Sequence, residues 1–161
     1  MNQFQTKCSK ILNLMVNITK RDQSFGYQFL SRYEILTEHE LLKRPENQLL
    51  IRMNVDPTFG NLHRTLHGGA SATIVDTATT VALSGFDKKE RINTTCNLSL
   101  DYMAPAKLES DIYILNEVQK VGRTLGFTEC RIFNEDLRLL VTGKHNKILL
   151  DQKYDIENET W

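Results

Sequence analysis

The sequence predicts an α+β fold in which an antiparallel sheet wraps around one long central helix, with a further helix at the N-terminus. Apolar residues recur three and four positions apart between His67 and Ser84, and strand-like patterns run from Asn93 onward. The connections between those strands are short, which favours antiparallel neighbours. With 161 residues, of which 40% are apolar, the chain can form one core, and we assign residues 1–150 to a single domain and 151–161 to a flexible tail.

The segments before the central helix are predicted to form a surface helix and then two strands. The first segment repeats apolar residues at helical spacing, at Ile11, Leu12, Met15 and Ile18. A helix of this kind that carries lysines can also mimic a mitochondrial transit peptide, so both interpretations stay open. Strands are expected at Tyr27 to Leu36 and at Gln48 to Val55, and the charged, proline-containing segment from His39 to Asn47 is expected to be a loop.

The central helix and the strands that follow it are bounded by turn residues. A proline, a glycine and an asparagine interrupt the chain before the helix, at Pro57, Gly60 and Asn61. The apolar positions of the helix are Ile74, Val75, Ala78, Val81 and Ala82. Four strands are expected over residues 94–103, 111–121, 124–133 and 137–150. We expect nearly all of the helix to be buried by this sheet.

Composition excludes several classes of protein. Lys plus Arg and Asp plus Glu each number 20, so the formal charge is zero and no basic field attracts nucleic acid. No apolar stretch is long enough for a membrane span, and the N-terminus lacks the pattern of a secretory signal. The three cysteines are widely spaced, which argues against a disulfide framework and a thiolate zinc site. We therefore expect a reducing compartment, the cytoplasm in the first place.

Asp76 is the one charged side chain between Thr65 and Phe86. A half-exposed helix in a chain with 25% charged residues should carry several charges, so this segment is predicted to be enclosed. An unpaired ionised carboxylate in such a place costs several kcal/mol, which suggests a role for it. Two interpretations remain open, since Asp76 could serve in function or could anchor the sheet through hydrogen bonds.

The sequence Leu66-His67-Gly68-Gly69 stands at the start of the central helix. Free backbone N–H groups at a helix start can stabilise an oxyanion that develops on an attacked carbonyl, by about 3 to 4 kcal/mol per donor. A merely flexible glycine turn is the alternative interpretation. The segment lacks the spacing of the nucleotide phosphate loops, so a nucleotide phosphate is not the expected anion.

The spacing of Gly68 and Asp76 predicts a dimer. Eight positions along one helix separate them by about 12 Å. A base and a carbonyl-polarising N–H must each lie within about 3 Å of the reacting atoms. If both groups act, they must therefore come from different subunits, with two antiparallel helices related by a two-fold axis and two equivalent sites.

Metal binding and serine catalysis have little support. His63 and His67 have the i, i+4 spacing of two metal ligands, but the glutamate of H-E-x-x-H is missing, and local hydrogen bonding in the turn is the preferred role for His67. Neither Ser71 nor Ser84 stands in a G-x-S-x-G motif or has an identifiable base. We expect no metal.

Three long segments together resemble one known family, the hotdog-fold acyl-CoA thioesterases of the phenylacetyl-CoA-thioesterase-like group, and most closely the thioesterase superfamily member two type. They read NLHRTLHGGASATIVDTATTVAL, NLSLDYMAPAKLESDI and VGRTLGF, between Asn61 and Ile148. The combination of Leu-His-Gly-Gly, an aspartate within the helix and Tyr-Met-x-Pro-Ala-Lys is specific. The resemblance implies a hotdog fold, tetramers built from two dimers, and no metal or organic cofactor.

The resemblance also implies roles for four positions. Asp76 matches the family's general base or nucleophile, and Gly68 matches the glycine whose N–H polarises the thioester carbonyl. Asn61 matches a polar residue that holds the thioester or water, and Thr95 stands where relatives place a water-orienting serine. Relatives usually have glycine where Arg64 stands here, so substrate preference is less certain than the reaction type.

Further residues are candidates for substrate binding. They are His67 and Gly69 beside the glycine, and the basic residues Lys107, Arg123 and Lys144 near strand ends. Basic residues at strand ends, Lys120 among them, are usually solvated, and they point only weakly to a phosphate-bearing ligand.

The leading hypothesis is hydrolysis of a fatty or aromatic acyl-CoA to the free acid and CoA, as part of lipid metabolism. A non-catalytic module that binds acyl-CoA or lipid in the same fold is the second hypothesis. A hotdog hydratase or dehydratase would need an acid and base pair, such as an aspartate with a histidine in reach, and the sequence places none of the four histidines clearly for this.

Overall fold

The computed structural model describes residues 3–36, 46–155 and 158. Its helices are α1 (Gln3–Arg21), α2 (Tyr27–Leu30) and α3 (Gly68–Phe86), with one 3-10 turn at Pro57–Phe59. Its strands are β1 (Glu34–Ile35), β2 (Gln48–Asn54), β3 (Arg91–Tyr102), β4 (Asp111–Val121), β5 (Leu125–Asn134) and β6 (Leu139–Lys153). Within the described residues they form one antiparallel sheet in the order β1-β2-β4-β5-β6-β3. The predicted α+β class is confirmed.

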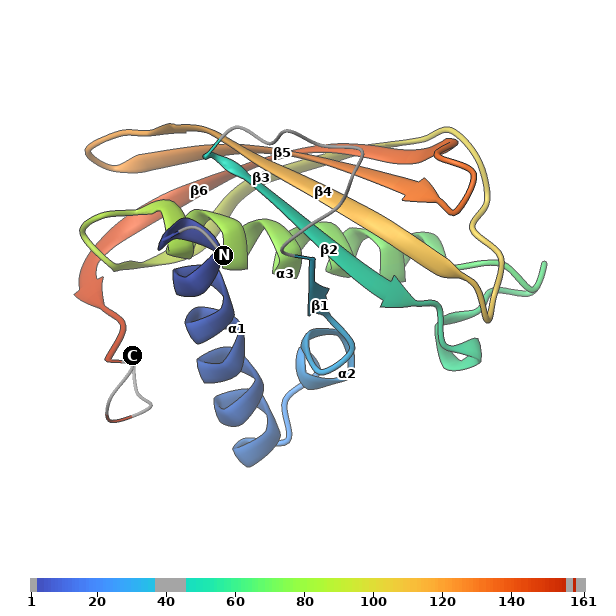
Figure 1. Cartoon of the computed structure of the whole chain (residues 1–161), viewed down its shortest axis with the longest axis horizontal. Coiled ribbons are helices and arrows are strands. Elements are labelled where there is room, and N and C mark those ends of the chain that lie inside the picture. Colours follow the sequence, from blue (N-terminus) through green and yellow to red (C-terminus); the bar gives the residue numbers. More distant parts are fainter. Residues whose placement is uncertain (1–2, 37–45, 156–157, 159–161) are drawn as a thin grey trace.

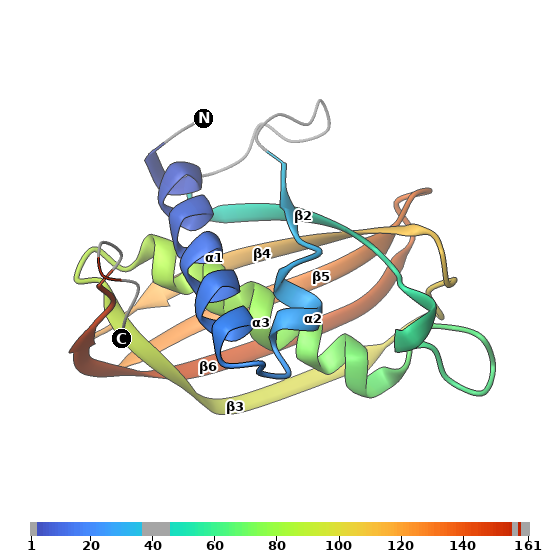
Figure 2. The same ribbon diagram turned by 90° about the horizontal axis from the view of Figure 1, so that it is seen from below.

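Helix α3 lies between the sheet and the other two helices (Figure 1; Figure 2). Its apolar residues Ile74, Val75, Ala78, Val81 and Ala82 are all buried, which confirms the helical spacing seen in the sequence. The helix starts at Gly68, and the His67 side chain caps it by accepting a hydrogen bond from the Gly69 N–H. Only 10 of its 19 residues are buried, so the expected burial of nearly all of the helix is wrong, and its partly exposed residues are mainly threonines and other small or uncharged residues.

Helix α1 crosses α3 at a position where only glycine fits. A methyl group added to Gly85 would overlap Cys8 Sγ and would lie 3.2 Å from the Cys8 Cα and N atoms. The apolar positions predicted for the N-terminal helix all face this contact or the neighbouring core. The two helices therefore approach closely because residue 85 lacks a side chain.

We expect Gly85→Ala to lower the free energy of unfolding by about 1 to 3 kcal/mol, since an overpacked contact forces the helices apart. Cys8→Ala in the same chain should recover part of this loss, because it removes the overlapping sulfur atom. Gly26→Ala is the matched control, because a methyl group there meets ordinary contacts of 3.6 Å and 3.7 Å. Urea denaturation gives the free energy of unfolding of the parent, the two single variants and the double variant. Equal values for Gly85→Ala and the parent would contradict the expectation.

Two sequence predictions in the first half of the chain need correction. The segment from Tyr27 to Leu36 is not one strand, because it forms α2 and then only the two-residue strand β1. The adjacent residues Phe29 and Leu30 are both buried within this helical turn. The loop expected from His39 to Asn47 falls mainly outside the described residues.

The connection after β3 does not join neighbouring strands. Residues 103–110 lead from β3 at one edge of the sheet to β4 in its interior, and β3 pairs with β6 instead. The prediction of antiparallel neighbours holds for the turns between β4, β5 and β6 and is wrong for this one. A short connection does not specify the pairing here, because β2 and β5 already occupy both edges of β4.

Strand β3 forms one edge of the sheet along almost its whole length (Figure 2). It is 12 residues long, and its middle, from Thr94 to Asn97, is exposed. The edge at the other side of the sheet, β1, has only two residues. A long, exposed edge strand is a ready site for pairing with another strand.

The C-terminal segment is more ordered than the sequence predicts. Strand β6 continues to Lys153, and Tyr154 is buried with its hydroxyl 3.0 Å from Ser84 Oγ. Residues 151–153, which were assigned to the tail, are therefore part of β6, and Tyr154 contacts α3 through Ser84. Trp161 lies outside the described residues.

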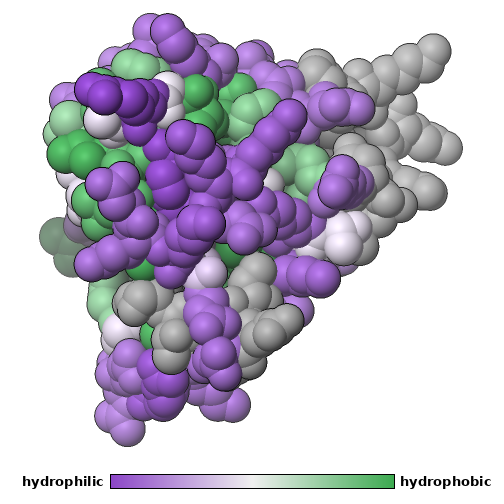
Figure 3. Space-filling model, turned by 90° about the vertical axis from the view of Figure 1, so that its left-hand side faces the viewer, coloured by the Kyte–Doolittle hydropathy of each residue, from purple (hydrophilic) through white to green (hydrophobic). Residues whose placement is uncertain are grey.

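All three cysteines are free, with Cys8 and Cys130 buried and Cys96 exposed on β3. No helix among the described residues is long and apolar enough to cross a membrane. Figure 3 shows the end of the molecule that lies on the left in Figure 1, where hydrophilic side chains cover most of the face and hydrophobic ones show between them.

Candidate active site

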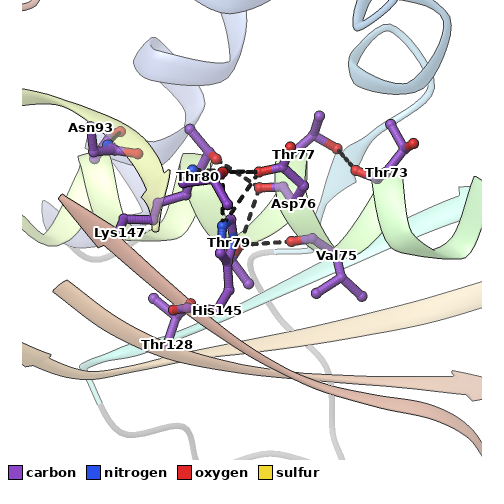
Figure 4. A network of polar contacts seen from close by, with 12 residues as sticks. Thr73, Val75, Asp76, Thr77, Thr79, Thr80, Asn93, Thr128, His145 and Lys147 are labelled. Carbon is purple, nitrogen blue, oxygen red and sulfur yellow. Dashed lines mark hydrogen bonds and ion pairs between the residues drawn. The ribbon is translucent and has the colours of Figure 1, made fainter. Parts of the chain in front are cut away.

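Asp76 lies on α3 where that helix faces strands β3 and β6, and 43% of its side chain is exposed. Three side chains converge on its Oδ1 atom: Thr95 Oγ1 donates at 3.2 Å, Lys147 Nζ at 3.4 Å, and His145 Nε2 lies 3.6 Å away. Figure 4 shows Lys147 and His145 reaching from β6 toward the carboxylate. The structure thus brings Asp76 and Thr95 together, and it adds two basic residues that the sequence analysis missed.

The two missed residues share the inward face of β6. Along this strand Gly143, His145, Lys147 and Leu149 alternate with more exposed neighbours. The inward face of a strand usually carries apolar core residues. A histidine and a lysine on this face are unusual, because basic side chains are rarely fully buried. That alternation, read with the correct register, was the signal that could have found them.

His145 is fully buried and links α3 to β3. Its Nδ1 lies 2.7 Å from Thr79 Oγ1 and its Nε2 lies 3.1 Å from Thr95 Oγ1. Burial, and next the neighbouring Lys147 ammonium, lower the pKa of His145 to about 4, so the ring is neutral at pH 7. A neutral ring has one N–H. It can therefore donate to only one of the two threonines, and the Thr79 hydroxyl also donates to the Val75 carbonyl oxygen at 2.6 Å.

The buried histidine predicts a dependence of stability on pH. As the pH falls, the unfolded chain protonates this ring near its ordinary pKa of 6.5, whereas the folded chain resists until about 4. The stability that the neutral ring contributes is complete above pH 6.5 and is lost as the pH falls toward 4. The free energy of unfolding of the parent should fall between pH 7 and pH 4, and in His145→Gln this fall should be smaller by on the order of 2 kcal/mol. Urea denaturation at several pH values measures the free energy of unfolding of both proteins. The same dependence on pH in both would refute the prediction.

Lys147 is also almost completely buried, with 3% of its side chain exposed. Burial lowers its pKa from the ordinary value, and the nearby carboxylate of Asp76 opposes that shift. Asp76 remains the one charged side chain of its own segment, but Lys147 from β6 forms an ion pair with it. His145, which the sequence does not place clearly, lies within reach of the carboxylate.

The start of α3 forms a second polar region, beside a cavity of about 350 Å³. Its lining includes Asn61, Gly68 and Ser71 on one side and apolar residues of β5 and β6 on the other. The Tyr102 hydroxyl closes one wall by donating to the Gly68 carbonyl oxygen at 2.9 Å. The cavity is thus partly polar near the glycine and apolar near the sheet.

The amide groups at the start of α3 have different roles. The Gly69 N–H donates to His67 Nδ1 at 2.9 Å, so it serves the helix cap, as the local role preferred for His67 requires. The Gly68 N–H has no hydrogen-bond partner among the described residues, as expected of the first residue of a helix. Gly68 therefore offers the free donor that the sequence suggests, and Gly69 does not in this state.

The Asn61 side chain shapes the loop that leads to α3. Its amide donates to Thr65 Oγ1 at 3.0 Å, and its oxygen accepts from the N–H groups of His63 and Thr65. It lies on the same cavity as Gly68. The predicted site residues therefore form two pairs within the chain, Asn61 with Gly68 and Asp76 with Thr95, at different positions along α3.

The candidate basic residues are not gathered in one place. Lys107 precedes β4 and Arg123 follows it, so they lie at opposite ends of an 11-residue strand, about 30 Å apart. Lys144 is exposed on β6, where its Cα is paired with that of Glu129. Arg64 is exposed and has a positive φ of 58°, in the backbone region that glycine adopts most readily. One subunit alone cannot direct all of these cations at one ligand.

The serines and the histidine considered for catalysis or metal binding show no catalytic arrangement among the described residues. Ser84 contacts Tyr154 and Asn93, and Ser71 is buried at the cavity. His63 is exposed. Across the described part of the chain, no three His, Cys, Asp or Glu side chains are grouped as metal ligands.

A family model and a curated relative both match this chain to thioesterases. The family model of the thioesterase superfamily matches residues 63–141. Human acyl-coenzyme A thioesterase 13 is 34% identical over 116 residues, which cover 71% of this chain and 82% of that protein.

Solved structures agree with this match. The crystal structure of zebrafish thioesterase superfamily member 2 has a TM-score of 0.67 at 30% identity and covers 77% of this chain and 86% of that one. Mouse thioesterase superfamily member 2 has a TM-score of 0.71 at 24% identity, over 92% of this chain and 98% of that one, and shows the same fold. The resemblance noted in the sequence and the hotdog fold it implies are confirmed. The chain therefore belongs to the thioesterase superfamily.

Proposed function

We propose that this protein hydrolyses an acyl-CoA thioester to a free carboxylic acid and CoA. The observation that carries the proposal is the Asp76 carboxylate. It is 43% exposed on an otherwise uncharged helix and is held through one oxygen by Thr95, Lys147 and His145. Relatives named acyl-coenzyme A thioesterases, which align over most of this chain, support acyl-CoA as the substrate class.

In the proposed reaction Asp76 acts as a general base on water. The water oxygen forms a bond to the thioester carbon as its proton moves to the carboxylate, and the carbonyl oxygen becomes an oxyanion. The N–H of Gly68 stabilises that oxyanion. The carbon–sulfur bond then breaks, and the proton held by Asp76 passes to the CoA thiolate. Direct attack by the carboxylate on the thioester is the alternative, which would form an anhydride that water opens.

We propose that each site is shared by two subunits. Gly68 and Asp76 are eight positions apart on one continuous helix, about 12 Å, so both cannot reach one carbonyl within a chain. The exposed edge of β3 offers a pairing surface for a second copy, and Thr95 and Asp76 lie beside that edge. Two β3 strands paired about a two-fold axis would bring Asp76 of each chain toward Gly68 of the other. We further expect two such dimers to form a tetramer.

The other candidates take supporting roles in this proposal. Thr95 orients Asp76 or the attacking water, and Asn61 holds the thioester or water beside Gly68. Lys107, Arg123 and Lys144 contact the phosphates of CoA only if a second subunit brings them together. We expect the protein to work in a reducing compartment, since all three cysteines are free.

The test is a panel of acyl-CoA substrates of different chain length, including an aromatic one, with free CoA measured by a thiol reagent. Turnover of at least one substrate supports the proposal. A rise in melting temperature with acyl-CoA but no release of CoA would favour a non-catalytic binding module instead. Hydration of an enoyl-CoA in a parallel assay, with no thioester hydrolysis, would favour a hydratase.

A further inference from the structure

Lys147 is buried more deeply than the carboxylate it contacts. Its side chain is 3% exposed against 43% for Asp76, and its Nζ lies 3.4 Å from Asp76 Oδ1. An ammonium group in such a place carries a large desolvation cost, and removal of its partner would leave it uncompensated. The lysine therefore lies beneath the carboxylate, between α3 and β6, and not in the opening from which a substrate would come.

The two carboxylate oxygens of Asp76 differ in their contacts. The hydrogen bonds and ion pairs from Thr95, His145 and Lys147 all end on Oδ1. Among the described residues none ends on Oδ2. A general base must keep one lone pair free for the proton it removes. The arrangement anchors one oxygen and leaves the other available.

Of the described groups around Asp76 within one subunit, Lys147 alone is placed to supply a positive charge. His145 is neutral above about pH 4, and Thr95 is an uncharged donor. Tyr33 faces the same region of α3, where its hydroxyl lies 2.6 Å from Thr77 Oγ1, and it too is uncharged. An ammonium within ion-pair distance attracts a carboxylate oxygen, so the loss of this charge weakens the hold on Asp76 Oδ1.

We propose that Lys147 is a positioning residue for the hydrolysis, which anchors Asp76 through Oδ1 so that Oδ2 faces the attacking water. The inference rests on the proposed thioesterase function and extends it to a residue that touches no substrate. Lys147 acts through Asp76 alone.

The test compares Lys147→Met, which removes the charge but keeps an unbranched chain, with Lys147→Arg, which keeps the charge. We expect Lys147→Met to lower kcat for acyl-CoA hydrolysis by about 10- to 100-fold, with KM changed little. Lys147→Arg should restore part of the rate. Lys153→Met is the matched control, since Lys153 is an exposed lysine on the same strand.

A second comparison separates positioning from a general structural effect. If Lys147 acts through Asp76, Lys147→Met in an Asp76→Asn chain should not lower the residual rate further. Lys147→Met with the parent's kcat would overturn the proposal, and so would an equal loss in both backgrounds. Thermal melting confirms that each variant is folded, and Lys147→Gln replaces Lys147→Met if the latter does not fold. Absence of turnover in the parent, or full turnover in Asp76→Asn, would instead mean that the proposed function fails.

Discussion

Replacement of Asp76 by asparagine is expected to lower kcat for acyl-CoA hydrolysis by about 10²- to 10⁴-fold, because the general base is lost. The amide has the same shape, and its oxygen can still accept from Thr95 and Lys147, so the fold should survive. The melting temperature should fall, because the amide no longer balances the buried Lys147 ammonium. Thiol release measures the rate, and circular dichroism and thermal melting measure the fold.

Asp136→Asn is the matched control for the first prediction, since Asp136 is an exposed aspartate in the turn between β5 and β6. It should hydrolyse acyl-CoA at the rate of the parent. If Asp76→Asn does the same, Asp76 is not the base, and its contacts with β3 and β6 serve only to anchor the helix.

The second large effect is expected from Gly68→Pro, which deletes the backbone N–H proposed to stabilise the oxyanion. Proline is well tolerated at the first position of a helix, and His67 already has the extended conformation that precedes proline, with φ −65° and ψ 138°. The Cβ atom would lie 3.6 Å from the Tyr102 ring, an ordinary contact. The variant should therefore fold and lose about 10²- to 10³-fold in kcat.

Gly68→Ala distinguishes the effect of losing the N–H group from the effect of adding a side chain. It adds the same Cβ atom beside Tyr102 but keeps the donor, so it should lose far less activity than Gly68→Pro. Equal losses in the two variants would show that the space beside Tyr102 matters and that the amide does not.

The fold could be predicted from the sequence where the pattern is local and repeated. Helix α3 and strands β3 to β6 each carry a long periodic pattern, and each is found within a few residues of the expected range. The segment from Tyr27 to Leu36 is too short and mixed for its period to be decided, and its helical turn depends on a stacked contact between Phe29 and Phe59. The partner of β3 also depends on the whole sheet, which no local pattern encodes.

The candidate site was predictable in part for the same reason. Asp76 and Gly68 are evident because charge is absent around one and glycines surround the other. His145 and Lys147 were missed because they are 66 and more positions away from α3 partners such as Thr79, and only the register of β6 turns both toward the helix. Tyr154 was assigned to a tail because a single aromatic residue among polar ones gives no periodic signal.

A mixed dimer tests the central claim, that two subunits share each site, most directly. Asp76→Asn and Gly68→Pro chains carrying different tags are expressed together, and the dimer that holds one of each is purified. If the sites are shared, one site in this dimer has both defects and the other has an intact Asp76 from one chain and an intact Gly68 from the other. We expect about half of the activity of the parent dimer. A mixed dimer as inactive as the two single variants would contradict the shared site.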